Sequence, residues 1–188
     1  MQASRSMSNS KIGPAFVAWC AALVSACATG GGGAVPHAGP DVPPAIALPA
    51  TEQPVLRVDA RGTQNYACRA NPDGTHGSQW VLVGPEAELF DSAGKVVGRH
   101  YAGPTWENVA DGSKVVAKMN AHADAPEADA VPWLLLTATE ASGQGMFAAV
   151  KSVQRVDTHG GKAPSTACSS GDEVKVPYRA VYWFSRAK

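Results

Sequence analysis

The sequence predicts an all-β domain, an antiparallel sandwich or barrel of about nine short strands with long loops. Three observations carry this prediction. Short apolar runs begin near residue 51 and are separated by turn signals at roughly the 8–12-residue spacing typical of such folds. Several runs alternate apolar and polar residues, as strands with one buried face do. No window of about 12 residues shows the 3.6-residue periodicity of an amphipathic helix.

The expected strands are short segments spread along the domain. Residues 176–185, "VPYRAVYWFS", alternate so that Tyr178, Tyr182 and Phe184 share one face. The run "WLLL" (133–136) lacks alternation, which favours a central strand covered on both faces. The other expected strands are 55–60, 63–68, 79–83, 87–90, 96–102, 114–119, 132–140 and 146–156.

Turn chemistry separates these strands. Residues 71–77, "NPDGTHG", and 91–95, "DSAGK", combine Asn, Asp and Gly in the manner of tight turns. Residues 121–130 are rich in alanine but contain Pro126, so we expect a loop with at most one helical turn. Residues 157–175 are expected to form a long loop containing Gly and Ser.

The first 26 residues predict a cleaved signal peptide. Arg5 and Lys11 are the only charges before Cys27, and the apolar run 15–26 is shorter than the roughly 20 residues that a spanning helix needs. The sequence "VSAC" (24–27) resembles the bacterial lipobox, in which the cysteine receives a diacylglycerol and the leader is cut before it. An ordinary signal peptide that contains a cysteine is the alternative.

On the lipobox interpretation, Cys27 is the lipidation site of a membrane-anchored protein. Residues 27–50, rich in Gly, Pro and Ala, then form a flexible, disordered tether, and residues 51–188 form a single domain. Acyl chains make the membrane an expected partner. Ala28 stands where an aspartate would favour inner-membrane retention, so the resemblance implies a periplasmic lipoprotein of the outer membrane in a bacterial cell envelope.

On this interpretation, only two of the four cysteines remain in the mature domain. Cys20 leaves with the leader and Cys27 is lipidated, so Cys68 and Cys168 remain in an oxidising compartment. We expect these two to form a disulfide, with two buried free thiols as the alternative. No CxxC motif and no closely spaced histidine pair is present, so no metal site is expected. No G-x-G-x-x-G lies between a strand and a helix, and no cofactor is expected.

Charge argues against nucleic acid as a partner. The chain has 16 basic and 16 acidic residues, and it contains no basic run interleaved with aromatic residues. No G-x-S-x-G motif marks a serine hydrolase. The sequence therefore indicates neither nucleic-acid binding nor serine-hydrolase activity.

One mixed aromatic and polar run, residues 100–113, is the leading candidate for a functional site. Its candidates are His100, Tyr101, Trp106, Glu107, Asn108 and Asp111. Exposed aromatic and polar side chains in such a run hold a small molecule or a glycan. Alternatively, His100 with Asp111 or Glu107 acts as a general acid–base pair. The purely structural interpretation places Trp106 in the core, His100 at a strand end and residues 111–113 in a turn.

A second candidate run is "QRVDTHGGKAP" (154–164). Arg155, Thr158 and His159 are its candidate ligand contacts, and the amides around its two adjacent glycines could approach an anion. The alternative is a glycine-turned loop in which Arg155 pairs with Asp157 or another carboxylate. A meeting of the two runs in space would favour a shared pocket.

Several motifs in fixed order are similar to those of a known family. The motifs are "GTQNYAC" (62–68), "GRHYAGPTWENVADGS" (98–113), "VPWLLL" (131–136), "VQRVDTHGGKAP" (153–164) and "VPYRAVYWF" (176–184). Together they resemble the uncharacterised family called domain of unknown function 3455, which occurs in secreted bacterial and fungal proteins. The resemblance covers about residues 50–187 and implies no established activity.

The function expected from these observations is a small-ligand or glycan binding module at the cell envelope. The alternatives are a hydrolase-like envelope enzyme and a structural or assembly factor. An enzyme needs His100 within hydrogen-bond reach of a carboxylate in an open cleft. If the protein is an assembly factor, we expect an exposed apolar patch and no pocket.

Overall fold

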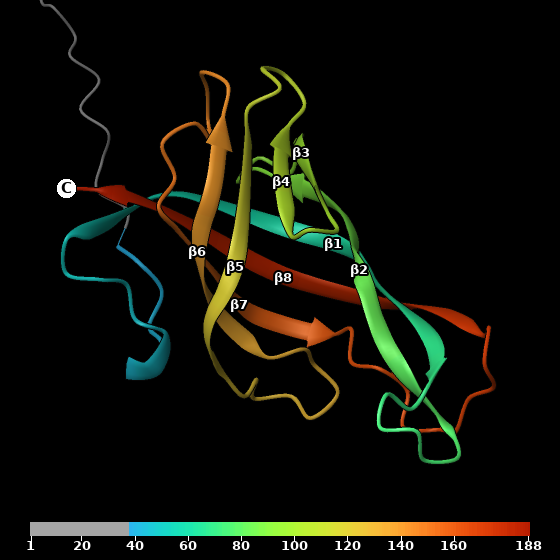
Figure 1. Ribbon diagram of the computed structural model, residues 1–188. Coiled ribbons are helices and arrows are strands. Elements are labelled where there is room, and N and C mark those ends of the chain that lie inside the picture. The colour runs from blue at the N-terminus through green and yellow to red at the C-terminus, as the bar shows by residue number, and fades with distance from the viewer. Residues whose placement is uncertain (1–37) are drawn as a thin grey trace, which may run out of the picture. The chain divides into compact units, whose positions relative to one another are not determined.

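The computed structural model describes residues 38–188, which form a closed barrel of eight antiparallel strands (Figure 1). Each strand pairs with the next along the chain, and β8 pairs with β1 to close the sheet. The strands are β1 (Glu52–Ala70), β2 (Ser78–Phe90), β3 (Val96–Tyr101), β4 (Thr105–Asn108), β5 (Lys114–Ala123), β6 (Trp133–Ser142), β7 (Ser152–Gly160) and β8 (Glu173–Ala187). The all-β prediction is confirmed in its barrel form.

Two strands are longer than predicted because their glycines do not break them. The expected segments 55–60 and 63–68 merge into β1 across Gly62, which pairs with Ala87 of β2. A Cβ on Gly62 would lie 2.5 Å from the Cα of Ala87, so glycine permits a close approach of the two strands here. The segments 79–83 and 87–90 likewise merge into β2, where Gly84 lies at a register shift in the pairing with β1.

Other strand boundaries also differ from the prediction. The four-residue strand β4 lies within the run 100–113 and was not expected, since it is too short to show a period. Residues 157–160 belong to β7 rather than to a loop, whereas residues 146–151 lie outside any strand. Asp157, with φ of 49°, lies in the register shift that lets β7 continue to Gly160.

Aromatic side chains fill one part of the barrel interior. The alternation expected in residues 176–185 is observed: Tyr178, Tyr182 and Phe184 are buried, whereas Arg179 between them is exposed. Trp106 of β4 packs edge-on against Phe184, which also contacts Phe147. This cluster closes the interior on one side and leaves a cavity on the other.

Part of the predicted tether packs against the barrel. Residues 44–46 form a short 3-10 helix, η1 (Pro44–Ile46), which contacts β5 and β6. The side chain of Ile46 is completely buried, and its carbonyl oxygen accepts a 2.7 Å hydrogen bond from Nε2 of Gln154 on β7. The ordered domain therefore begins before residue 51. The predicted signal peptide, the lipidation site Cys27 and tether residues 27–37 lie outside the described residues.

The predicted disulfide is present between Cys68 and Cys168, which are 100 residues apart. It joins the end of β1 to the loop that precedes β8. Closing a loop of this length restricts the unfolded chain, an effect worth about 4.7 kcal/mol in the chain-entropy model. Within residues 38–188, no helix is long and apolar enough to cross a membrane.

Candidate functional site

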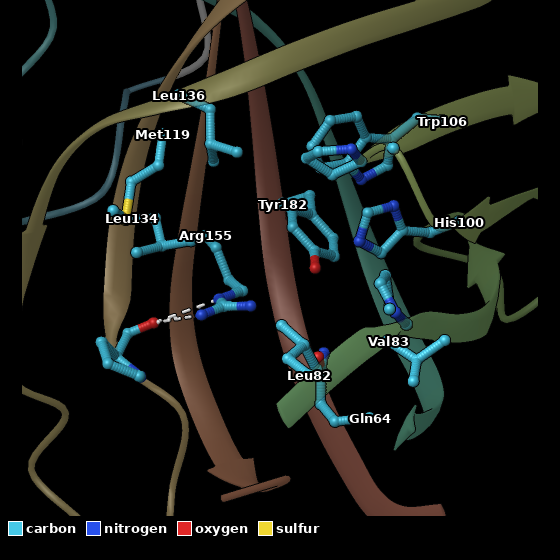
Figure 2. A pocket seen from close by; sticks show the side chains of 15 residues that line it. Gln64, Leu82, Val83, His100, Trp106, Met119, Leu134, Leu136, Arg155 and Tyr182 are labelled. Carbon is cyan, nitrogen blue, oxygen red and sulfur yellow. Dashed lines mark hydrogen bonds between the residues drawn. The ribbon is translucent and has the colours of Figure 1, made fainter. Parts of the chain in front are cut away.

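A pocket of about 390 Å³ opens inside the barrel between β2, β5, β6 and the β3–β4 turn (Figure 2). Its apolar walls include Leu82, Val83, Pro85, Pro104, Met119, Leu134 and Leu136. Its polar or aromatic members are Gln64, His100, Trp106, Arg155 and Tyr182. Eight-stranded barrels have interiors just wide enough for side chains or for one small ligand, and here the side chains leave space unfilled.

The rim of the pocket is apolar and open to solvent. Leu82, Val83 and Met119 are 52%, 55% and 59% exposed, and all three line the pocket. They come from strands on opposite sides of the opening, β2 and β5. An apolar molecule that enters the pocket therefore meets apolar surface before it meets any charge.

His100 and Trp106 form one wall of the pocket. Antiparallel pairing of β3 with β4 sets these two residues directly opposite each other, and their rings stack with centroids 4.3 Å apart. Tyr182 of β8 meets both rings edge-on, at 5.1 Å from His100 and 5.3 Å from Trp106. This arrangement makes a rigid aromatic surface.

His100 is a neutral histidine with a defined tautomer. Burial lowers its pKa to about 3, and the nearby positive charge of Arg155 acts in the same direction. Nδ1 lies 2.8 Å from the carbonyl oxygen of Thr105, which can only accept a hydrogen bond. The proton of the neutral ring therefore resides on Nδ1, and Nε2 carries a lone pair.

Arg155 supplies the charge of the pocket. Its Nε and Nη2 both donate to the carbonyl oxygen of Pro132, at 3.1 and 2.9 Å. Figure 2 shows the guanidinium turned toward Tyr182 on its other side. Burial raises the pKa of Tyr182, and a hydrogen bond with Arg155 acts in the opposite direction. Among residues 38–188, no carboxylate forms an ion pair with Arg155, so the alternative in which Arg155 pairs with Asp157 or another carboxylate is not observed.

Two buried N–H donors in the pocket wall lack acceptors. The Nε1 of Trp106 and the Nε2 of Gln64 have no hydrogen-bond partner in the described part of the chain. The Gln64 amide nevertheless lies close enough to the Tyr178 hydroxyl to lower its pKa, against the larger effect of burial, which raises it. Buried polar groups without partners are rare in proteins, and a ligand is one way to satisfy them.

Tyr101 and Glu107 lie on the outer face of the barrel, away from this pocket. The Tyr101 hydroxyl donates to Oε2 of Glu107 at 2.8 Å, and Arg99 and Lys114 form ion pairs with the same oxygen. These residues line a separate, open hollow on the outer surface. The hydrogen bond from Tyr101, together with the two cations, lowers the pKa of Glu107, which is ionised at neutral pH.

Asn108 and Asp111 hold the turn that follows β4. The Asn108 side-chain oxygen accepts from the amide of Ala110 at 2.7 Å, and Asp111 accepts from the amide of Ser113 at 2.7 Å and that of Met146 at 3.3 Å. In the described residues, no carboxylate lies within hydrogen-bond reach of His100. Neither Asp111 nor Glu107 is thus placed as its acid–base partner.

The second candidate run reaches the pocket only through Arg155. Thr158 donates to the carbonyl oxygen of Val131 at 2.6 Å, which fixes the loop before β6. His159 lies at the surface with Nδ1 2.6 Å from Glu127, and its Nε2 is 3.5 Å from Asp157. The two runs therefore meet through four side chains, namely His100, Pro104, Trp106 and Arg155.

Most of the pocket wall was not predicted from the sequence. Gln64, Leu82, Val83, Met119, Leu134, Leu136 and Tyr182 come from five strands and stand alone or in pairs in the sequence. The inward face of residues 176–185 indicated that Tyr182 points into the domain. The other residues could be assigned to one pocket only with knowledge of the strand register in the barrel.

A comparison with protein-family models agrees with the order of the motifs. Residues 49–186 match the model of a family described as protein of unknown function, DUF3455. The chain belongs to the DUF3455 family. The match spans all eight strands of the barrel except the last residue of β8, so the pocket lies wholly within the DUF3455 domain. Comparisons with curated proteins and with solved structures give no match.

Proposed function

We propose that this DUF3455 protein binds a small, mainly apolar molecule inside its barrel. The observation that carries this proposal is the open pocket of about 390 Å³, whose walls are apolar except for a few inward polar groups. Ligand sites in proteins typically have volumes of about 300–1,000 Å³ and this composition. The stacked His100 and Trp106 rings give the ligand a flat surface to contact.

The composition of the pocket favours an apolar ligand over a glycan. A glycan has a hydroxyl group on most carbons and needs many polar partners, whereas Leu82, Met119, Leu134 and Leu136 present only hydrocarbon or thioether surface. The pocket also favours ligand binding over a purely structural or assembly role, which requires no cavity.

The geometry does not favour a hydrolase. A general base needs a basic nitrogen and a partner that orients it, but His100 donates to a backbone carbonyl and its pKa is lowered to about 3. Its imidazole remains unprotonated through the whole neutral range. We infer that His100 contributes a wall and a hydrogen-bond acceptor rather than proton transfer.

The proposed setting is the bacterial cell envelope, with lipid attached to Cys27. The support is the sequence alone: a short apolar leader, the residues "VSAC" and a Gly-rich segment after the cysteine. A barrel held beside a membrane would be close to a source of apolar molecules. Cys27→Ser should abolish incorporation of labelled fatty acid and release the protein from membranes, and retention of label would contradict the proposal.

Titration with the neutral fluorescent probe N-phenyl-1-naphthylamine tests the binding function. The purified full chain should bind the probe with saturable fluorescence enhancement. Leu134→Trp, which adds volume inside the pocket, should weaken binding at least about tenfold, the effect of losing about 1.4 kcal/mol. Val109→Trp, at a residue 60% exposed and outside the pocket, is the matched control and should leave binding unchanged. Equal binding by both variants would contradict the proposed site.

A further inference from the structure

We propose that the ligand of this pocket is an amphiphile whose carboxylate binds Arg155. This inference rests on the proposed binding function and specifies its ligand class. The apolar body of the ligand would lie between Leu82, Met119 and Leu134, and its carboxylate would meet the guanidinium within the pocket.

The positive charge of Arg155 has no anionic partner among residues 38–188. Its side chain is partly buried against apolar residues. A guanidinium cannot lose its proton in a protein, so the cost of burial has to be offset by an anion or by hydrogen bonds. Its hydrogen bonds go to the carbonyl oxygen of Pro132 and to the neutral hydroxyl of Tyr182, and neither partner carries a charge.

The geometry of the guanidinium also suits a carboxylate. The bonds from Nε and Nη2 to Pro132 hold the side chain in one orientation. The remaining N–H groups, on Nη1 and Nη2, face the side of the pocket where the neutral Tyr182 hydroxyl lies, and a carboxylate bound there would share these donors with that hydroxyl (Figure 2). Two parallel N–H groups match the two oxygens of a carboxylate.

The charge balance of the pocket also favours an anion. Among residues 38–188, Arg155 is the only charged side chain that lines the pocket at neutral pH, because His100 is neutral and no Asp, Glu or Lys of these residues belongs to the wall. Attraction between opposite charges is stronger at a desolvated site than in water, so this wall selects a monoanion over a neutral molecule of the same shape.

Isothermal titration of the purified full chain with decanoate and decan-1-ol tests this inference. The two probes have the same chain length and differ in head group. We expect decanoate to bind at least about tenfold more tightly than decan-1-ol, since hydrogen bonds between charged groups are stronger than those of a neutral hydroxyl. Arg155→Met should remove this preference, and Arg155→Lys should retain part of it because the charge remains while the paired N–H groups are lost.

Two controls keep the outcome interpretable. Arg179→Met removes the same charge from an exposed position on β8 outside the pocket, and the preference for decanoate should persist in that variant. Binding of N-phenyl-1-naphthylamine by Arg155→Met shows that the pocket of this variant is intact. If Arg155→Met fails to fold, the comparison of decanoate with decan-1-ol in the wild type and in Arg155→Lys tests the inference. Equal affinity for decanoate and decan-1-ol with normal probe binding overturns the carboxylate inference alone. Failure of the wild-type chain to bind the neutral probe overturns the proposed function as well.

Discussion

The imidazole of His100 lies almost parallel to the indole of Trp106, with an interplanar angle of 10°. Both residues are at most 3% exposed, yet both line the pocket, because their rings form the boundary between the packed part of the barrel and its cavity. The structural and the ligand-binding interpretations of residues 100–113 are therefore compatible: the same two rings serve the core and the pocket.

Burial of neutral His100 predicts that the stability of the domain depends on pH. Because the folded pKa of about 3 is below the ordinary value of 6.5, the unfolded chain binds a proton that the folded chain does not. The contribution of His100 is therefore fully present above pH 6.5 and is lost as the pH falls toward 3. Its limiting slope is about 1.4 kcal/mol per pH unit.

Urea unfolding of the wild type and of His100→Gln between pH 7 and pH 5 measures this contribution. The free energy of unfolding of the wild type should fall more steeply than that of His100→Gln as the pH is lowered. Parallel curves for the two proteins would show that His100 binds protons equally in the folded and the unfolded states.

Asp111 is predicted to be a structural residue. Its carboxylate accepts hydrogen bonds from the amides of Ser113 and Met146, and the bonds from Ser113 are the main cause of its lowered pKa. Asp111→Ala should lower the melting temperature at pH 7 while leaving probe binding intact. The loss should shrink as the pH falls below 3.8, where the unfolded carboxyl is protonated. A variant that folds normally but binds no ligand would contradict this assignment.

Ile46 is predicted to be part of the folded domain rather than of a tether. Its side chain is fully buried, so Ile46→Ala should lower the free energy of unfolding by about 2–4 kcal/mol. Val109→Ala, at an exposed position, should change it by less than about 0.5 kcal/mol. Chemical denaturation of both variants makes the comparison, and similar values would show that residues 38–50 do not pack on the barrel in solution.

Gly62 is predicted to be essential for the close contact of β1 with β2. Gly62→Ala would bring a methyl group to 2.5 Å from the Cα of Ala87, so the strands must separate, at a cost of about 3 kcal/mol. Gly39→Ala is the control, because a Cβ there meets only the Pro54 side chain, at 3.3 Å. Thermal unfolding should detect the difference, and a stable Gly62→Ala protein would contradict the strand pairing described.

The sequence was sufficient to predict the fold class and several strands, because alternation is a local signal. Residues 176–185 show it clearly, and the segment is β8. The merging of strands at Gly62 was not predictable, since a glycine that ends a strand and a glycine that allows close approach look the same in the sequence. The register shift at Asp157, which extends β7, also has no signature that distinguishes it from a turn.

The candidate site was predictable only in part, for a related reason. His100, Trp106 and Arg155 stand out by residue type, and the structure brings them to one pocket. Tyr101 and Glu107 are adjacent to them in sequence but point outward, because neighbouring residues on a strand face opposite sides. Leu82, Met119 and Leu134 are ordinary strand residues, and their role depends on the closure of the barrel.

The indole N–H signal of Trp106 in a nitrogen–proton correlation spectrum tests the central claim most directly. Trp106 lines the pocket and its buried N–H has no hydrogen-bond acceptor in the described part of the chain, whereas the indole N–H of Trp80 donates to the carbonyl oxygen of Thr166 at 3.2 Å, outside the pocket. With both signals assigned by Trp→Phe substitution, addition of N-phenyl-1-naphthylamine should shift the Trp106 signal saturably and leave the Trp80 signal in place. A saturable shift of Trp80 without any shift of Trp106, or no shift of either signal, would contradict binding in the barrel pocket.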